Sequence, residues 1–340
     1  KAVYVSLAPS FISEFSSAEP QQIIHALKQL GFAGVSETAL GAQEVSAHMG
    51  EQLKKNSGHI YISSACPTVV QYIKKYVPQL SDRVSDLFSP VLAHAKLLRR
   101  EYGDDIAVVF IGPCISKMHE SDEYRDLLNV ALTFDTLRAW FDSKGLNLQN
   151  QPVDTNDSFV PEPAQEGALY PIDGGMIAGI KANCTVNDAT FMSFSGLEHI
   201  KQLVNDLPQV PQDSNICLEL LACAGGCVNG PGAGRNPATA MKRYNLINFT
   251  SYPETEIPRR PTLDIHNTYC AESVREPEYS EEDIRMALSR VGKYSADDEL
   301  NCGGCGYDSC REFAAAMLGG KAEREMCVSY MRQLANKKAN

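Results

Sequence analysis

The sequence lacks any long hydrophobic run. No stretch of about 18 consecutive apolar residues, which a membrane-spanning helix needs, occurs in the chain of 340 residues. A surplus of basic residues is also absent, because 31 Lys and Arg stand against 42 Asp and Glu and give a net charge of −11. This balance argues against non-specific nucleic-acid binding. No signal-peptide pattern opens the chain, so we expect a cytoplasmic protein.

Cysteine, in contrast, is abundant. The chain has 11 cysteines, and short-spaced cysteines in an intracellular protein usually bind metals or take part in redox chemistry rather than form disulfides. Eight of them fall in short motifs. The other three, Cys184, Cys217 and Cys270, stand alone, and we expect each to be a small buried hydrophobic residue.

Strand and helix patterns alternate along most of the chain. Short apolar runs predict strands at residues 3–7, 59–63, 106–111 and 216–221. Amphipathic segments between them predict helices, for example from Pro20 to the stop signal at Gly31 and from Val91 to Gly103. Such alternation predicts an α/β fold with mostly parallel sheets.

The end of the chain reads as a separate small domain. Residues 248–278 are rich in proline and polar residues, which indicates a connecting segment. Ser280, with Asp283 three residues later, then predicts a helix start. We therefore expect two domains, at residues 1–275 and 276–340.

Four cysteines of the C-terminal domain have the spacing C-x2-C-x4-C-x16-C. They are Cys302, Cys305, Cys310 and Cys327. Four thiolates suit zinc or a 4Fe–4S cluster. Zinc ribbons usually pair two C-x2-C units, so this spacing favours 4Fe–4S, and a unit this small should depend on its metal for folding. The wording C-G-Y-D-S-C-R-E-F-A resembles the small 4Fe–4S domain of corrinoid iron–sulfur proteins and of some hydrogenase-like proteins.

The other four motif cysteines follow predicted strands. Cys66 and Cys114 each come after one strand, and Cys223 and Cys227 come after a third. Since ligands in α/β proteins bind beyond the carboxyl ends of strands, these cysteines are expected to converge on an iron–sulfur cluster. The C-x3-C spacing places Cys223 and Cys227 one helical turn apart, with neighbouring glycines letting the backbone approach the cluster. The alternative for Cys66 and Cys114 is an ordinary core position.

These three motifs together resemble the signature motifs of the FeFe hydrogenases. The family's T-S-C-C-P reads S-S-A-C-P at residues 63–67, and its P-C-x-x-K-x-x-E reads P-C-I-S-K-M-H-E at 113–120. Its E-x-M-A-C-x-x-G-C-x-x-G-x-G reads E-L-L-A-C-A-G-G-C-V-N-G-P-G at 219–232. A-P-S at residues 8–10 and D-G-G at 173–175 also match. The resemblance spans nearly the whole chain and implies the two-lobed hydrogenase fold.

The resemblance also implies a cofactor, the H-cluster. In the family, four cysteines hold a 4Fe–4S cluster. One of these cysteines also bridges to a diiron site that carries CO, cyanide and a bridging dithiolate amine. Lys117 would donate a hydrogen bond to one cyanide, although Lys117 and Glu120 could instead form an ordinary helical ion pair. Pro9 and Ser10 would line the second cyanide and the amine. The implied cluster ligands here are Cys66, Cys114, Cys223 and Cys227, with Cys227 as the bridge.

Position 65 departs from the family pattern. Active members carry a cysteine there, whose thiol passes protons between solvent and the amine, whereas Ala65 has no ionisable group. The resemblance also implies an acidic relay after the first helix, which we expect to be absent here. An ungapped comparison places Met49 and Gln52 near the positions of its glutamates, with Glu51 adjacent. Two further departures, which should tune the cluster through its surroundings, are Leu221 and Gly112 in place of methionines.

The chain keeps the cofactor motifs, lacks the proton-shuttle cysteine and carries the C-terminal cysteine domain. In this combination it resembles the sensory FeFe hydrogenases. That resemblance implies slow, reversible H2 oxidation and proton reduction, with the C-terminal 4Fe–4S cluster as the electron exit. It implies a redox partner, a signalling kinase or phosphatase, and maturases that install the diiron site. One alternative is a hydrogenase-like iron–sulfur protein without the diiron site, which serves in cluster assembly or electron transfer. Another is a non-enzymatic interaction module with structural clusters.

Overall fold

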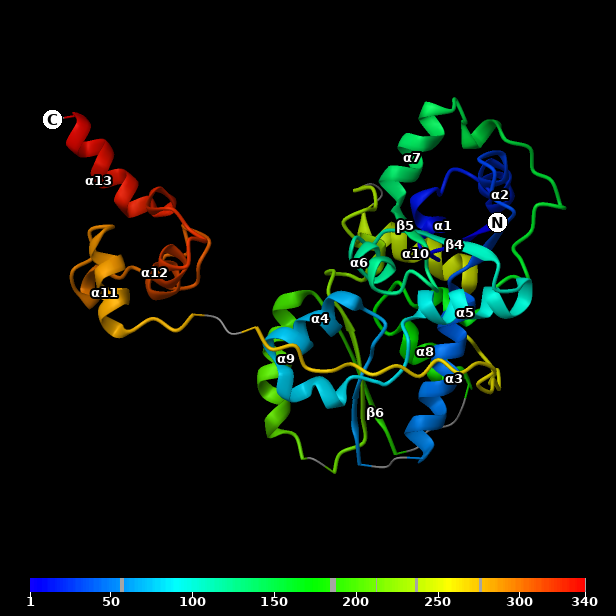
Figure 1. Ribbon diagram of the computed structural model, residues 1–340, viewed down its shortest axis with the longest axis horizontal. Coiled ribbons are helices and arrows are strands. Elements are labelled where there is room, and N and C mark those ends of the chain that lie inside the picture. The colour runs from blue at the N-terminus through cyan, green and yellow to red at the C-terminus, as the bar shows by residue number, and fades with distance from the viewer. Residues whose placement is uncertain (56–57, 184–187, 212, 236–237, 275–276, 340) are drawn as a thin grey trace. The chain divides into compact units, whose positions relative to one another are not determined.

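The computed structural model describes residues 1–340 except 56–57, 184–187, 212, 236–237, 275–276 and 340. The chain divides into two compact units, Lys1–Ser273 and Val274–Asn340, and each is described by itself (Figure 1).

The first sheet of the large unit has four parallel strands in the order β2-β1-β4-β5. Central strand β4 is apolar and almost fully buried, as expected for a parallel strand covered on both faces. The strands are β1 (Ala2–Leu7), β2 (Gly34–Glu37), β4 (Ile106–Gly112) and β5 (Val130–Thr133).

The second sheet has three parallel strands in the order β3-β7-β6. Its central strand β7 is buried along its whole length. The strands are β3 (Ile60–Ile62), β6 (Thr190–Ser195) and β7 (Ile216–Leu221). The predicted α/β fold with mostly parallel sheets is confirmed, and every predicted strand is present within a few residues of its expected ends.

In the part of the large unit that the structure describes, ten α-helices connect and cover these strands (Figure 1). Helix ends follow local signals: Pro20 opens α2, and Gly103 ends α5 with φ 85°. The helices are α1 (Phe11–Glu14), α2 (Pro20–Gln29), α3 (Ala39–Lys55), α4 (Pro67–Tyr76), α5 (Pro90–Tyr102), α6 (Ser116–Glu123), α7 (Phe134–Ser143), α8 (Gly175–Asn183), α9 (Leu197–Asp206) and α10 (Thr239–Thr250).

The predicted connecting segment is only partly a linker. Its first residues belong to α10, because the helix continues to Thr250. Farther on, the segment packs along the large unit: the Phe88 N–H donates to the Ile265 carbonyl over 2.8 Å, and Glu44 accepts the Leu263 N–H over 2.8 Å. Hydrogen bonds from the backbone of the predicted connecting segment therefore fix this part of it to the large unit.

The small unit is mainly helical, as predicted. Its helices are α11 (Glu281–Ser289), α12 (Cys310–Leu318) and α13 (Val328–Ala339). Ser280 and Asp283 form the expected capping box at the start of α11. The buried apolar residues of this unit form two small clusters, which include Ile284, Leu288 and Phe313.

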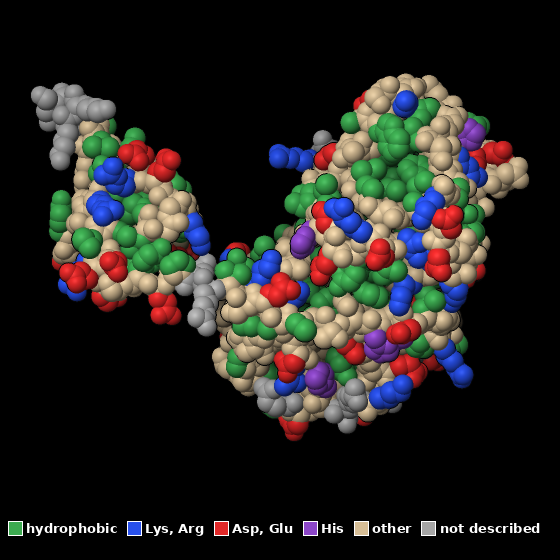
Figure 2. All heavy atoms as spheres, in the orientation of Figure 1, with side chains coloured by type: hydrophobic (Ala, Val, Ile, Leu, Met, Phe, Trp, Pro, Cys, Tyr) green, Lys and Arg blue, Asp and Glu red, His purple; other side chains and the backbone are tan. Residues whose placement is uncertain are grey.

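The visible surface mixes charges of both signs, without a dominant basic area (Figure 2). Among the described helices, none combines the length and the apolar character that a membrane crossing requires.

Candidate metal centres

A cavity of about 90 Å³ lies where the carboxyl ends of both sheets meet. Its walls come from segments that directly follow β1, β2, β3 and β4, and from the last residue of β7. This is the place where α/β folds bind ligands. The cavity is lined by the motif residues Pro9, Ser10, Ala65, Cys66, Cys114, Lys117, Leu221 and Cys227.

The four motif cysteines converge at this cavity. Cys66, Cys114 and Cys227 line it, and Cys223 lies close enough to interact electrostatically with all three. Burial, and then the neighbouring thiols, raise the pKa of Cys223 to about 11 and that of Cys227 well above its ordinary value. A cationic iron cluster would favour the thiolate forms that burial disfavours.

The expected helical turn between Cys223 and Cys227 is wrong. Residues 222–226 form a turn in which Gly225 and Gly226 have φ angles of 78° and 93°. These left-handed conformations suit glycine and interrupt a right-handed helix. Cys227 instead opens a short 3-10 helix, Cys227–Asn229.

The glycines of this loop also allow close approaches between backbone segments. A Cβ atom at Gly226 would lie 2.3 Å from the Pro171 carbonyl oxygen, and one at Gly230 would lie 2.5 Å from the Pro113 carbonyl oxygen. The close neighbours of these glycines are therefore backbone atoms of the segments after η3 (Glu166–Leu169) and β4. The small residues let three backbone segments meet around the cavity.

Lys117 and Glu120 form a buried ion pair at the cavity wall. The Lys117 Nζ donates to Glu120 Oε2 over 2.6 Å and to Ser89 Oγ over 2.9 Å. Both side chains are only 9% exposed. The ion-pair interpretation therefore describes the contact present here. An ammonium has three donors, so one donor remains for a ligand in the cavity.

The cavity wall also fits a hydrogen-bonding cofactor at a second point. The buried Ser10 Oγ has no hydrogen-bond partner within the described residues, although buried hydroxyls are normally paired. Ser10 lines the cavity. An iron cluster could bind the four cysteine thiolates, and a polar ligand on its iron could accept a hydrogen bond from the Ser10 hydroxyl. The residues present therefore fit the implied group.

The departures from the family pattern lie at different distances from this site. Ala65 and Leu221 line the cavity. Gly112 has no room for a side chain, because a Cβ atom there would lie 2.4 Å from the Phe110 ring. Met49, Glu51 and Gln52 occupy the last part of α3 and do not line the cavity, whereas Thr38, just before α3, does.

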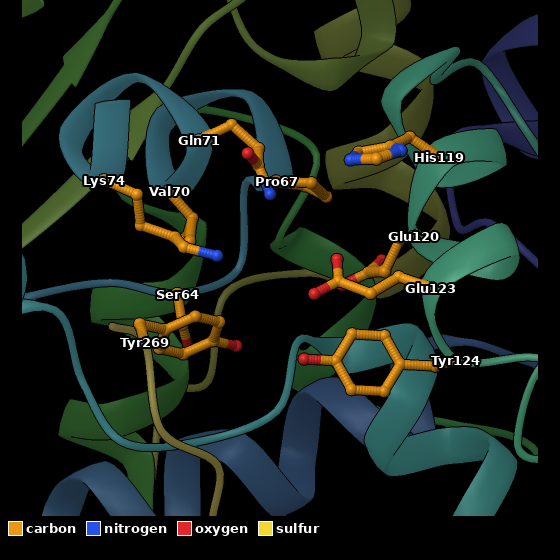
Figure 3. A pocket seen from close by; sticks show the side chains of 10 residues that line it. All are labelled: Ser64, Pro67, Val70, Gln71, Lys74, His119, Glu120, Glu123, Tyr124 and Tyr269. Atoms are coloured by element: carbon orange, nitrogen blue, oxygen red, sulfur yellow. The ribbon is translucent and has the colours of Figure 1, made fainter. Parts of the chain in front are cut away.

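A second, smaller cavity of about 20 Å³ adjoins the Lys117–Glu120 pair. Glu120 and Glu123 project from α6 toward Gln71 and Lys74 of α4, with Tyr124 and Tyr269 below them (Figure 3). Its volume is enough for about one water molecule. The ion pair thus lies between the two cavities, because Lys117 lines the larger one and Glu120 lines the smaller one.

Sequence analysis missed a buried polar network behind the cavity. Thr38 Oγ1 lies 2.7 Å from Ser6 Oγ, which lies 2.7 Å from Nδ1 of His94, and His94 Nε2 lies 2.8 Å from Ser36 Oγ. Full burial lowers the pKa of His94 to about 3, so its ring is neutral. The sequence signal was the alternation of Ser6 and Ser36 with apolar residues in otherwise apolar strands.

Sequence analysis also passed over the first residue of the third motif. Glu219 is 2% exposed and accepts the backbone N–H of Met176 at the start of α8 over 3.2 Å. Burial outweighs this hydrogen bond and raises the pKa of Glu219 to about 7. The motif residues Asp173 and Gly174 lie beside it, and Asp173 pairs with Arg243 over 2.9 Å.

The four C-terminal cysteines line one cavity of about 10 Å³ in the small unit. Cys302 is exposed, Cys305 is half-buried, and Cys310 and Cys327 are buried. Gly303 and Gly306, with φ angles of 67° and 86°, turn the chain between the first three. Among the described residues, no three His, Cys, Asp or Glu side chains are placed to hold a single metal ion.

The isolated cysteines differ from one another. Cys217 is fully buried in β7, where burial raises its pKa to about 12, so its predicted core role is confirmed. The prediction is wrong for Cys270, which is exposed because the segment that carries it runs along the surface. Cys184 lies outside the described residues.

Two family models match the chain. The model for the iron-only hydrogenase large subunit, C-terminal domain, matches residues 1–231. A shorter model named FeS, for an Fe–S cluster segment, matches residues 298–329.

Curated relatives are hydrogenases at low identity. Iron hydrogenase 1 of Clostridium pasteurianum is 24% identical over 287 residues, which cover 68% of this chain and 50% of that protein. The periplasmic Fe hydrogenase large subunit of Nitratidesulfovibrio vulgaris is 25% identical over 283 residues, which cover 68% of this chain and 66% of that protein. The chain thus spans half the length of the first relative and 66% of the second.

Solved structures share the fold. A structure from a study of oxygen inactivation of the FeFe-hydrogenase H cluster has a TM-score of 0.62 at 20% identity, and covers 81% of this chain and 95% of its own. An apo FeFe-hydrogenase variant from Chlamydomonas reinhardtii has a TM-score of 0.61 at 19% identity, with the same coverage. The chain therefore belongs to the FeFe (iron-only) hydrogenase family and consists of the family's H-domain followed by an Fe–S region.

Proposed function

We propose that this chain is a slow, H2-sensing FeFe hydrogenase of the cytoplasm, which interconverts H2 with protons and electrons. The observation that carries the proposal is Ala65 on the wall of the cavity that three of the four converging cysteines line. The site keeps its thiols and its buried lysine, but position 65 offers only a methyl group. A methyl group cannot take part in proton transfer, so turnover should be slow.

Cys66, Cys114, Cys223 and Cys227 would hold the H-cluster. When bound, that group supplies the redox chemistry of H2. The protein's part is to hold the cluster by its thiolates, to exclude water, and to orient polar ligands. Lys117 would use its remaining donor for this purpose, held in place by Glu120 and Ser89. The unpartnered hydroxyl of Ser10 would contribute a second hydrogen bond.

The C-terminal cysteines would hold one further 4Fe–4S cluster, which would pass electrons to a redox partner. In a sensor, that exit would lead to a signalling kinase or phosphatase. Maturases would have to install the diiron site. The support for these partners is the family membership of the chain.

The alternative is a hydrogenase-like iron–sulfur protein without the diiron site, which serves in cluster assembly or electron transfer. One observation favours it: Lys117 already has a carboxylate and a hydroxyl as partners and does not require a cyanide to compensate its burial. The unpartnered Ser10 hydroxyl argues for the first proposal.

Infrared spectroscopy of the matured protein, under argon and then under H2, separates the two proposals. We expect sharp CO and cyanide bands that shift when H2 is added. If no such bands form after maturation that activates a known hydrogenase, the hydrogenase proposal is wrong and the iron–sulfur alternative remains. If the CO and cyanide bands form but do not shift when H2 is added, the diiron site is present and the proposed sensory role is wrong.

A further inference from the structure

The two buried cysteines of the C-terminal centre have polar neighbours at their sulfur atoms. Cys327 Sγ lies 3.2 Å from the hydroxyl oxygen of Ser329. Cys310 Sγ accepts the Asn301 N–H over 3.4 Å, and the Cys310 N–H donates back to Asn301 Oδ1 over 2.8 Å. Asn301 has a φ of 46°, a conformation that asparagine tolerates better than most residues. These contacts are made by the two buried cysteines, whereas Cys302 is exposed.

The direction of the Ser329 contact is fixed once Cys327 binds a metal. A free thiol can donate or accept, but a ligating thiolate has no proton and can only accept. The Ser329 hydroxyl must then donate to the sulfur, in a hydrogen bond strengthened by the charge of its acceptor.

Lys293 adds a positive charge to the same cavity. Lys293 is 5% exposed, and its Nζ donates to the Asp298 carbonyl over 2.6 Å, which holds it at the cavity wall near Cys327. Hydrogen bonds to cluster sulfurs and nearby cationic groups stabilise the more negative, reduced state of an iron–sulfur centre, so they raise its reduction potential.

We propose that Ser329, assisted by Lys293, sets the reduction potential of the C-terminal centre through Cys327. Ser329 is a positioning residue: it acts on the thiolate and not on a reacting atom. The inference rests on the proposed 4Fe–4S cluster at the C-terminal cysteines. It deepens the proposed function, because the potential of the exit centre decides to which partners electrons can flow.

The test is a potentiometric titration of the full chain after reconstitution with iron and sulfide, followed by electron paramagnetic resonance. Dithionite supplies the single electron that the centre takes up. The signal of the C-terminal centre is identified by its loss in Cys310→Ala. Iron and acid-labile sulfide are counted in every variant, so that a shifted potential is not confused with an incomplete cluster.

In Ser329→Ala we expect a more negative midpoint potential. At the wild-type midpoint, the ratio of oxidised to reduced centre should rise about threefold, which is roughly 30 mV for a one-electron couple. Ser329→Thr, which keeps the hydroxyl, should restore the wild-type value. Ser289→Ala is the matched control, because its hydroxyl lies in the same unit but bonds the Met286 carbonyl.

Two results would overturn the inference in different ways. An unchanged potential in a fully iron-loaded Ser329→Ala variant would reject the role of Ser329 and leave the cluster in place. C-terminal cysteines that bind zinc and no iron would reject the inference together with the C-terminal cluster. The infrared experiment tests the large unit independently of both.

Discussion

At the scale of single residues, the chemistry of the cavity depends on position 65. Ala65 is half-buried and lies next to Cys66, a proposed cluster ligand, on the cavity wall. Its backbone N–H donates to Ser63 Oγ over 3.2 Å, so the position is fixed even though its side chain carries no exchangeable proton. A cysteine side chain placed there would extend from an already ordered backbone.

We therefore expect Ala65→Cys to raise H2 turnover at least about tenfold, since positioned proton transfer is commonly worth 10² or more. H2 evolution and uptake are measured per H-cluster, with the cluster content taken from the infrared bands. Ala65→Val is the matched control, because it adds bulk without an exchangeable proton, and it should give no gain. Equal rates in the alanine and cysteine forms would mean that proton transfer is blocked elsewhere.

At the scale of elements, β7 and α8 meet through one buried carboxyl group. Glu219 on β7 accepts the backbone N–H of Met176 at the start of α8, where the helix dipole favours a negative charge. Burial has the larger effect and raises the pKa to about 7. The group is therefore half-protonated near neutral pH in the folded chain.

The raised pKa of Glu219 makes the free energy of unfolding depend on pH. The folded-state pKa of Glu219 lies above the unfolded value, so between about 4.5 and 7 the folded chain binds more protons than the unfolded chain. Stability should therefore fall as pH rises through this window, by at most about 3 kcal/mol from this group. In the apo chain, Glu219→Gln should remove that part of the decline in urea unfolding measured from pH 5 to pH 8.

Glu51→Gln is the control for this prediction. Its side chain is 41% exposed and lies on the surface of α3, so the pH dependence of unfolding should remain that of the wild type. The same decline in Glu219→Gln as in the wild type would show that Glu219 ionises in the fold at an ordinary pKa.

At the scale of the whole molecule, the two units differ in how they can be stable. The large unit has an extensive core that spans both sheets. The small unit has two minor apolar clusters around its cysteines, and domains of this size commonly need a metal or disulfides to fold.

We expect removal of iron by ferricyanide and EDTA to unfold the small unit while the large unit stays folded. Limited proteolysis should then degrade residues 274–340 and leave a fragment that ends near Ser273. The untreated chain, digested in parallel, should keep both units. A small unit that resists the protease after complete iron loss would show that its helices need no metal.

The sequence by itself determined the class of the fold and predicted the residues of the candidate site. Apolar runs of strand length alternate with amphipathic helices along the chain. This pattern favours a parallel α/β architecture, in which helices cover both faces of the apolar strands. Cys66, Cys223 and Cys227 follow neighbouring strands of the second sheet, so spacing along the chain was enough to place them at one edge, because parallel strands end at the same edge. Cys114 follows β4 of the first sheet, and its position beside them depends on how the two sheets pack.

Only the tertiary structure decided how the residues around the thiols are held. The turn at Gly225 and Gly226, the Thr38–Ser6–His94 network and the pKa of Glu219 all depend on contacts between segments far apart in the chain. The exposure of Cys270 likewise depends on where its segment packs. Burial and long-range hydrogen bonds are properties of neighbours in space, and spacing along the chain does not specify those neighbours.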